Sequence, residues 1–308
     1  MDAEQFSYLA LLVGVGLTAL ASIGYIALAL WPRVSYRSAA TDTGATMTIA
    51  VQDGASWLGP PVTATLWLAI AALSVSLGAR WVAAGRPPYA NMFEFTIGFG
   101  WALLVFYALF ELRATRREAS EEIDEPTADR AVGAFLVPVA LGMFAAALAF
   151  FPSDLRPLIP ALQANRILGA HVATIMLAYA ALSVSFGAAA AYLIQGEGRR
   201  FAQLPSGEAL EEFANRSVLI GFPLLTLGIT LGAFWGYSAW GRYWGWDPKE
   251  TSALMTWLIY SGYLHARNLR GWKGRGAAWL LVVGFAAVLF TYFAVNLWVS
   301  GLHSYAGV

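Results

Sequence analysis

Histidine is rare in this chain, and its positions decide what metal chemistry is available. The 308 residues contain three His and no Cys. His171 and His303 lie near the ends of long apolar runs, and His265 closes another. A neutral imidazole is the commonest metal ligand in proteins. The lack of cysteine excludes a thiolate metal site, a disulfide framework and a cysteine nucleophile. Any one histidine could instead be a hydrogen-bonded packing residue, so its surroundings must decide.

The most unusual segment is FWGYSAWGRYWGWDPKE, which runs from Phe234 to Glu250. Glycines alternate with aromatic residues along it. Because glycine disfavours a continuous helix and lets backbone approach a ligand closely, we expect a loop with a flat apolar surface. Each tryptophan can bury roughly 150–250 Å². Four of them need something large and flat to cover: Trp235, Trp240, Trp244 and Trp246.

The end of this aromatic segment has the pattern of a helix start. Asp247 is a good N-cap, Pro248 suits the first helical position, and Glu250 stands where a capping box places an acid. Capping alone would explain both acids. It would also fix the position of Trp246 next to a rigid helix.

The composition is that of an all-α, polytopic integral membrane protein. Hydrophobic residues make up 58% of the chain and charged residues 12%, against about 25% charged in soluble domains. The mean hydropathy is +0.59. With a net charge of zero, no attraction to nucleic acid is implied. Runs long enough to cross about 30 Å of hydrocarbon predict about eight transmembrane helices: Tyr8–Trp31, Val62–Leu77, Phe93–Glu111, Ala131–Phe151, Leu168–Ile194, Val218–Phe234, Thr251–His265 and Ala277–Val299.

Lys and Arg are unevenly divided between the two sets of loops, which predicts the orientation. The odd-numbered loops hold 13 of the 19. By the positive-inside rule those loops are cytoplasmic, and both termini and the Trp-rich loop are extracytoplasmic. His171, His303 and the aromatic loop then share the outer side, and His265 lies roughly 22 Å deeper. We also expect a flexible first loop and a short surface helix over Glu208–Asn215.

Two imidazoles beside a flat aromatic surface are typical of a haem site. The nitrogens would be axial ligands of iron and the rings would form walls for the porphyrin. Nearby carboxylates are too few for magnesium or calcium. Zinc would need a third protein ligand, for which Glu94 and Asp247 are the candidates. Glu94 and Asn91 either start a helix or line an outer site beneath the aromatic loop.

The run WGYSAWGRYWGWDPKE resembles the tryptophan-rich WWD signature of the cytochrome c assembly family. It is most similar to the CcsA (ResC) subunit of the system II cytochrome c synthetase, also called CcsB in some annotations. HVATIMLAYAAL, TWLIYSGYLHARN and NLWVSGLHSY also resemble that family, and PYANMFEF does so more loosely. Residues 1–80 resemble only transmembrane helices, so we assign residues 81–308 to the WWD haem-handling domain.

The resemblance implies a role in cytochrome c biogenesis at a bacterial plasma membrane. It implies that haem b is held outside by His171 and His303, over Trp235, Trp240, Trp244 and Trp246. Haem would then be joined to the CxxCH cysteines of apocytochrome c. His265 matches the family's transmembrane histidine, a ligand for haem on its way outward. Expected partners are a ResB/CcsB-like membrane subunit that supplies a second transmembrane histidine, a thioredoxin-like thiol reductase and membrane lipid.

The charged residues near the aromatic loop have several possible roles, and the sequence allows two rival functions for the protein. Asp247 is expected to orient the aromatic loop. Arg242 and Lys249 could meet the haem propionates, the apocytochrome or lipid headgroups. One rival function is a membrane electron-transfer cytochrome, which would ordinarily bring four histidines for two haems. The other is a haem transporter that performs no covalent chemistry.

Overall fold

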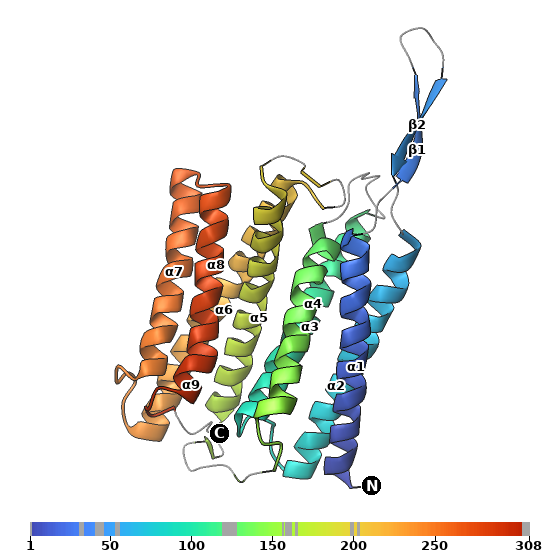
Figure 1. Cartoon of the computed structure of the whole chain (residues 1–308). Helices are drawn as coiled ribbons and strands as arrows, with labels where there is room; N and C mark the ends of the chain where they lie inside the picture. The colour runs from blue at the N-terminus through green and yellow to red at the C-terminus, as the bar shows by residue number, and fades with distance from the viewer. Residues whose placement is uncertain are drawn as a thin grey trace.

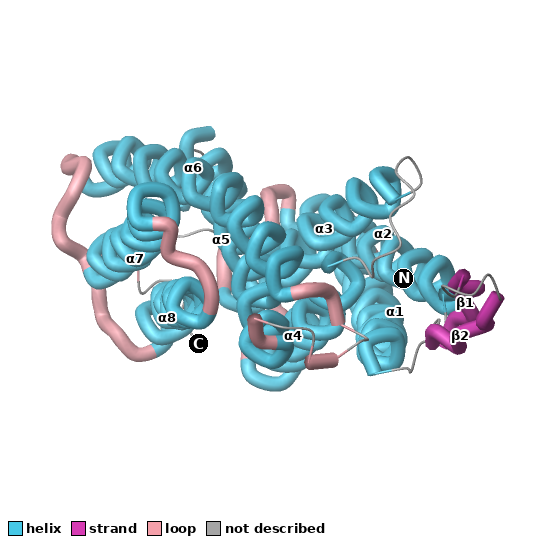
Figure 2. Tube along the Cα trace, turned by 90° about the horizontal axis from the view of Figure 1, so that it is seen from above, coloured by secondary structure: helices cyan, strands magenta, loops and turns pink. Residues whose placement is uncertain are grey.

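The computed structural model describes residues 2–30, 34–40, 46–52, 56–118, 128–155, 157, 162–163, 166–197, 200–201 and 204–303. In this part of the chain, long helices stand side by side in an elongated bundle (Figures 1 and 2). Their bounds are α1 Ala3–Leu30, α2 Gly59–Ala84, α3 Met92–Glu118, α4 Ala128–Phe150, α5 Arg166–Gln195, α6 Gly207–Trp240, α7 Pro248–Arg270 and α8 Arg275–Leu289. A π-helical turn, Phe290–Ala294, continues α8 into the short α9, Val295–Leu297.

The prediction of an all-α, polytopic membrane protein is confirmed. Each of the eight predicted apolar runs forms a long helix, and seven helices of the described part are long and apolar enough to cross a membrane. The helix that falls short is α7. Its 23 residues would span about 34 Å, but polar residues lower its hydropathy. α7 packs beside α8 and α6 within the bundle.

The connections alternate between the two ends of the bundle (Figure 1). The start of α1, the α6–α7 connection and α9 lie at one end, which we call the site end. The α7–α8 connection lies at the opposite end, with the antiparallel hairpin of β1 (Val34–Ala40) and β2 (Thr46–Gln52). The first loop, which we expect to be flexible, forms this hairpin in its described residues, where Val34 pairs with Gln52 and Ala40 with Thr46.

The helix α6 is longer than predicted at both ends. The expected surface helix Glu208–Asn215 is the beginning of α6, which Ser206 caps by accepting from the N–H of Ala209. At the other end α6 continues through Gly236 to Trp240, so the first seven residues of the expected aromatic loop are helical. Gly236 does not break the helix because it is buried against neighbouring structure. The helix ends only at Gly241, whose φ is 74°.

Glycines let α6 lie close against α5, the helix that carries His171. A Cβ on Gly228 would come within 2.5 Å of Ile175, and a Cβ on Gly232 within 2.7 Å of the His171 ring. Larger residues would push the two helices apart, because helix pairs approach only as closely as their side chains allow. The α5–α6 contact therefore sets the position of His171 in the bundle.

Candidate functional site

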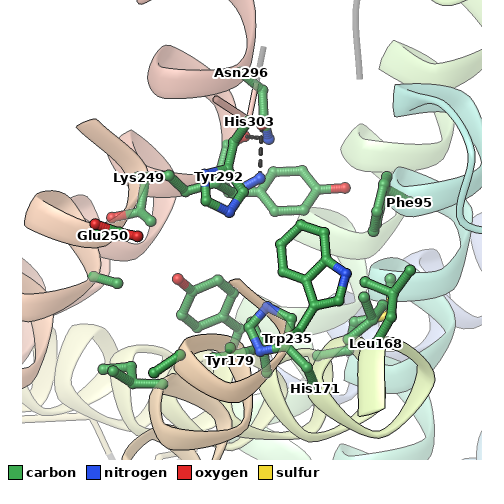
Figure 3. Close-up of a pocket in the computed structure, with 18 of the residues that line it drawn as sticks. Phe95, Leu168, His171, Tyr179, Trp235, Lys249, Glu250, Tyr292, Asn296 and His303 are labelled. Atoms are coloured by element: carbon green, nitrogen blue, oxygen red, sulfur yellow. Dashed lines mark hydrogen bonds between the residues drawn. The ribbon is translucent and has the colours of Figure 1, made fainter. Parts of the chain in front are cut away.

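A cavity of about 120 Å³ lies at the site end, between α3, α5, α6, α7, the π-helical turn and α9. Figure 3 shows His171 and His303 on opposite walls of it, with Trp235 between them. Aromatic and aliphatic side chains make up most of its surface. The lining residues include Phe95, Phe99, Leu168, Ile175, Tyr179, Trp240, Trp244, Lys249, Glu250, Tyr292 and Asn296.

His171 is held on α5 in one defined orientation. Its Nδ1 lies 2.8 Å from the carbonyl oxygen of Gly228. Because a carbonyl only accepts, the proton of the neutral ring is on Nδ1 and the lone pair is on Nε2. The indole of Trp235 stacks on the ring at 6.0 Å with an interplanar angle of 11°. His171 thus presents a nitrogen ligand beside the cavity.

His303 is held in the same tautomer from the other side. Its Nδ1 lies 2.7 Å from Oδ2 of Asp247, and a carboxylate accepts that N–H, so the lone pair of the neutral ring is again on Nε2. Burial lowers the pKa of His303, and the hydrogen bond to Asp247 opposes this without reversing it. The ring is therefore neutral at pH 7, as a metal ligand must be.

Asp247 joins two separate segments of the site, the start of α7 and the residues Leu302 and His303. It forms the predicted capping box with Glu250 at the start of α7, which confirms that prediction. Its Oδ1 also accepts from the N–H of Leu302 at 2.6 Å, and its Oδ2 accepts from His303. Burial raises the pKa of Asp247, but these hydrogen bonds outweigh that effect and hold the pKa below its usual value. The acid is a cap and also the residue that orients His303.

The four predicted tryptophans differ in their exposure and in their contact with the cavity. Trp235 is only 2% exposed and contacts Trp240 edge-on at 4.7 Å. Trp240 also meets the His303 ring at 4.9 Å, and Trp244 lines the cavity. Trp246 is 69% exposed, has a positive φ of 57° and does not line the cavity. It packs edge-on against Trp244 at 5.7 Å.

His265 does not join the cavity. It lies on an exposed face of α7, near the end of the helix that is remote from the cavity. The sequence prediction that His265 is far from the other two histidines agrees with this placement.

Glu94 and Asn91 do not line the cavity either, so that alternative is wrong. Glu94 is fully buried, with Nε of Arg80 at 2.9 Å and a guanidinium nitrogen of Arg86 at 2.8 Å. Asn91 accepts from the backbone N–H of Glu94. Two guanidinium groups share this one carboxylate, which lies outside the cavity lining. Within the described residues no three His, Cys, Asp or Glu side chains come together as a zinc site would need.

Several lining residues have no motif that would single them out. Tyr179, Tyr292 and Asn296 come from apolar stretches of α5, the π-helical turn and α9, where a polar side chain is itself the only signal. The π-helical turn Phe290–Ala294 widens α8 at this point, and such turns often occur at functional sites. In the sequence, Phe95 and Phe99 cannot be distinguished from ordinary core residues.

Two neutral imidazoles, an aromatic wall and one cation define the class of protein: a multi-pass, all-α membrane protein with a candidate bis-histidine site for a flat cofactor-like ligand. The chain belongs to the cytochrome c assembly protein family, whose model matches residues 89–303. Proteins named cytochrome c biogenesis protein CcsA are similar along most of their length. That of Synechococcus elongatus is 35% identical over 300 residues, 80% of this chain and 88% of the relative. Trichormus variabilis has one at 34% over 334 residues (82% and 91%), and Guillardia theta one at 35% over 263 residues (77% and 83%).

Proposed function

We propose that this protein acts in cytochrome c biogenesis, by holding haem b as substrate in the site-end cavity and presenting it to apocytochrome c. The observation that carries the proposal is the pair His171 and His303. Each donates Nδ1–H to an anchored acceptor, Gly228 O or Asp247 Oδ2, beside one aromatic cavity. Second hydrogen bonds of this kind orient histidine ligands and raise their basicity.

The donor set favours haem over a bare metal ion. Zinc in a protein takes three or four protein ligands, whereas iron in a porphyrin needs only two axial nitrogens. The walls contributed by Trp235, Trp240 and Phe95 suit the faces and edges of a porphyrin. His171, His303, Trp235, Trp240 and Trp244 would then form the binding surface, with Trp246 at its outer rim.

The covalent step draws its thiols from the acceptor protein. In thioether formation the S–H of a CxxCH cysteine adds across a vinyl C=C of haem. Sulfur bonds to one vinyl carbon and the hydrogen goes to the other, so no oxidant or reductant is consumed. This agrees with the lack of cysteine in the chain. The protein would act as a cytochrome c haem lyase by positioning, and a near-attack arrangement can supply several kcal/mol of the barrier.

The exposed face around His265 suits a partner helix. Met255, Leu258 and Leu269 are exposed on α7, and they follow the three- and four-residue spacing of one helix face together with Gly262 and His265. A Cβ on Gly262 would meet nothing, so another helix can approach closely there. A ResB/CcsB-like subunit with its own histidine would complete a second haem site on the path outward.

The charge distribution supports an extracytoplasmic position for the site end. The opposite end carries the Arg-rich connections, and the loops expected there hold 13 of the 19 Lys and Arg residues. The cavity would then face the compartment in which apocytochrome c and a thioredoxin-like reductase meet. This orientation in a bacterial plasma membrane is part of the proposal.

The proposal is tested by cytochrome c maturation in cells that express the chain with its partner subunit. His171→Ala, His303→Ala and Trp240→Ala should each abolish or strongly reduce holocytochrome c, while Trp272→Ala, exposed at the opposite end, should not. Equal maturation in all four would refute it. A transporter would move haem without acceptor protein, and an electron-transfer cytochrome would cycle its haem without releasing it.

A further inference from the structure

A single lysine projects into the cavity. Lys249 is the second residue of α7 and is largely buried among the lining residues. Its Nζ lies 2.7 Å from Oδ1 of Asn296 and donates to it (Figure 3). The described residues include no carboxylate in ion-pair contact with Lys249. An ammonium has three donors, so this side chain has capacity for a further acceptor.

The two acids nearest in sequence are already engaged elsewhere. Oε2 of Glu250 accepts from the backbone N–H groups of Gly245 and Asp247 at 2.8 and 3.1 Å. Asp247 accepts from Leu302 and His303. The start of α7 adds the positive end of its helix dipole. Because both acids are held by other donors, the ammonium of Lys249 keeps capacity for a further anionic acceptor, although the Glu250 carboxylate also lines this cavity.

Asn296 is fixed so that it can only accept from Lys249. Its Nδ2 donates to the carbonyl oxygen of Tyr292, which leaves Oδ1 facing the lysine. The π-helical turn Phe290–Ala294 precedes Asn296 and sets its rotation about the helix axis. Asn296 is neutral, so it orients the ammonium without adding a counter-charge.

Two axial nitrogens do not fix the rotation of the porphyrin about the axis that joins them. With Trp235 turned out of the space between the two rings, a porphyrin held by iron between His171 and His303 could still rotate about the line that joins the two nitrogens. Haem b carries its two carboxylates on one edge and its vinyl groups on others. A cation at one place on the cavity wall would remove this freedom, because rotation would break its charge-assisted hydrogen bonds.

We propose that Lys249, oriented by Asn296, binds a propionate of haem and so sets which edge of the porphyrin faces the acceptor protein. This assignment rests on the proposed haem site. It distinguishes Lys249 from the other candidate cation, Arg242, which is exposed, packs over Gly245 and does not line the cavity. Lys249 is a positioning residue with a direct contact to the substrate's carboxylate.

The test compares haem b with haem dimethyl ester, which has the same iron and vinyl groups but no carboxylate charge. The full chain in lipid nanodiscs is titrated with each, and the Soret band reports binding. Wild type should prefer haem b by about tenfold or more, as one charge-assisted contact implies. Lys249→Met should bring the ratio of the two affinities close to one. Lys249→Arg should keep the preference, and Lys273→Met, a lysine at the other end, should match wild type.

Each outcome of these titrations supports or overturns the assignment of Lys249. A wild-type ratio near one, or an unchanged ratio in Lys249→Met, would overturn the assignment. If wild type bound neither compound, the proposed haem site itself would fail. Should Lys249→Met not fold, Asn296→Leu serves in its place, because it removes only the acceptor that orients the ammonium. An unchanged ratio in Asn296→Leu and in Lys249→Gln would then refute the assignment.

Discussion

Replacing Asp247 with asparagine exchanges one carboxylate oxygen for an NH₂ group and should reverse the tautomer of His303. The carboxylate accepts from Leu302 N at Oδ1 and from Lys249 N and His303 Nδ1 at Oδ2. An asparagine offers one accepting oxygen and one NH₂ donor. If the oxygen stays on Leu302, the NH₂ faces the His303 ring. Nδ1 must then accept, which puts the ring proton on Nε2, where iron would bind.

The size of the effect on stability and on haem affinity follows from the hydrogen bonds that remain after each substitution. With its oxygen on Leu302, the asparagine loses the cap bond from Lys249 N as well as the charge-assisted bond to His303, so the free energy of unfolding should fall by about 2 kcal/mol. Haem affinity should fall about 10- to 100-fold, the usual effect of losing a carboxylate behind a histidine ligand. Asp247→Ala should cost more stability, about 3 kcal/mol, because the cap and two hydrogen bonds are lost together.

The assay is a haem titration of wild type, Asp247→Asn and Asp247→Ala in nanodiscs, with electron paramagnetic resonance of the ferric form and thermal unfolding of each variant. We expect Asp247→Asn to lose the bis-histidine signal while keeping most of its thermal stability. A bis-histidine signal in Asp247→Asn with an affinity within about twofold of wild type would refute the argument that Asp247 orients His303.

Three further predictions concern the packing at His171, the buried Glu94 and the protonation of His303. Gly232→Ala places a Cβ 2.7 Å from the His171 ring and should reduce haem affinity at least tenfold without loss of expression, as absorption titration would show. Glu94→Gln leaves two buried cations facing a neutral amide and should lower the unfolding free energy by about 3 kcal/mol, measured by thermal or denaturant unfolding. Because burial lowers the pKa of His303, the unfolded chain binds its proton first. Stability should therefore fall as pH drops below about 6.5, and less so in His303→Ala.

The fold could be predicted from local patterns because membrane spans are long and apolar. The helix boundaries could not be predicted, since a glycine in the sequence does not by itself show whether it ends a helix. Gly236 is inside α6 because burial against neighbouring residues stabilises the helix there, whereas Gly241 ends it with a positive φ. Which glycine breaks a helix depends on its packing, and the sequence does not contain that packing.

The site was partly predictable for a similar reason. The spacing of Asp247 and Glu250 predicts a capping box, and the structure forms it. Glu94 carries an equally clear helix-start pattern, but Arg80 from α2 reaches it across the bundle and buries it. Asn296 has no motif, and its role depends on a π-helical turn that residue spacing does not reveal. Contacts between distant segments decide the roles of Glu94 and Asn296, whereas the pair Asp247 and Glu250 is local.

The most direct measurement is the pyridine haemochrome and absorption spectrum of wild type, His171→Ala and His303→Ala, each purified after co-expression with a ResB-like partner. Wild type should contain low-spin, bis-histidine haem b. Each variant should lose that spectrum, and added imidazole should restore it by filling the space of the missing ring. Unchanged low-spin haem in both variants would contradict the assignment of His171 and His303 as the axial pair.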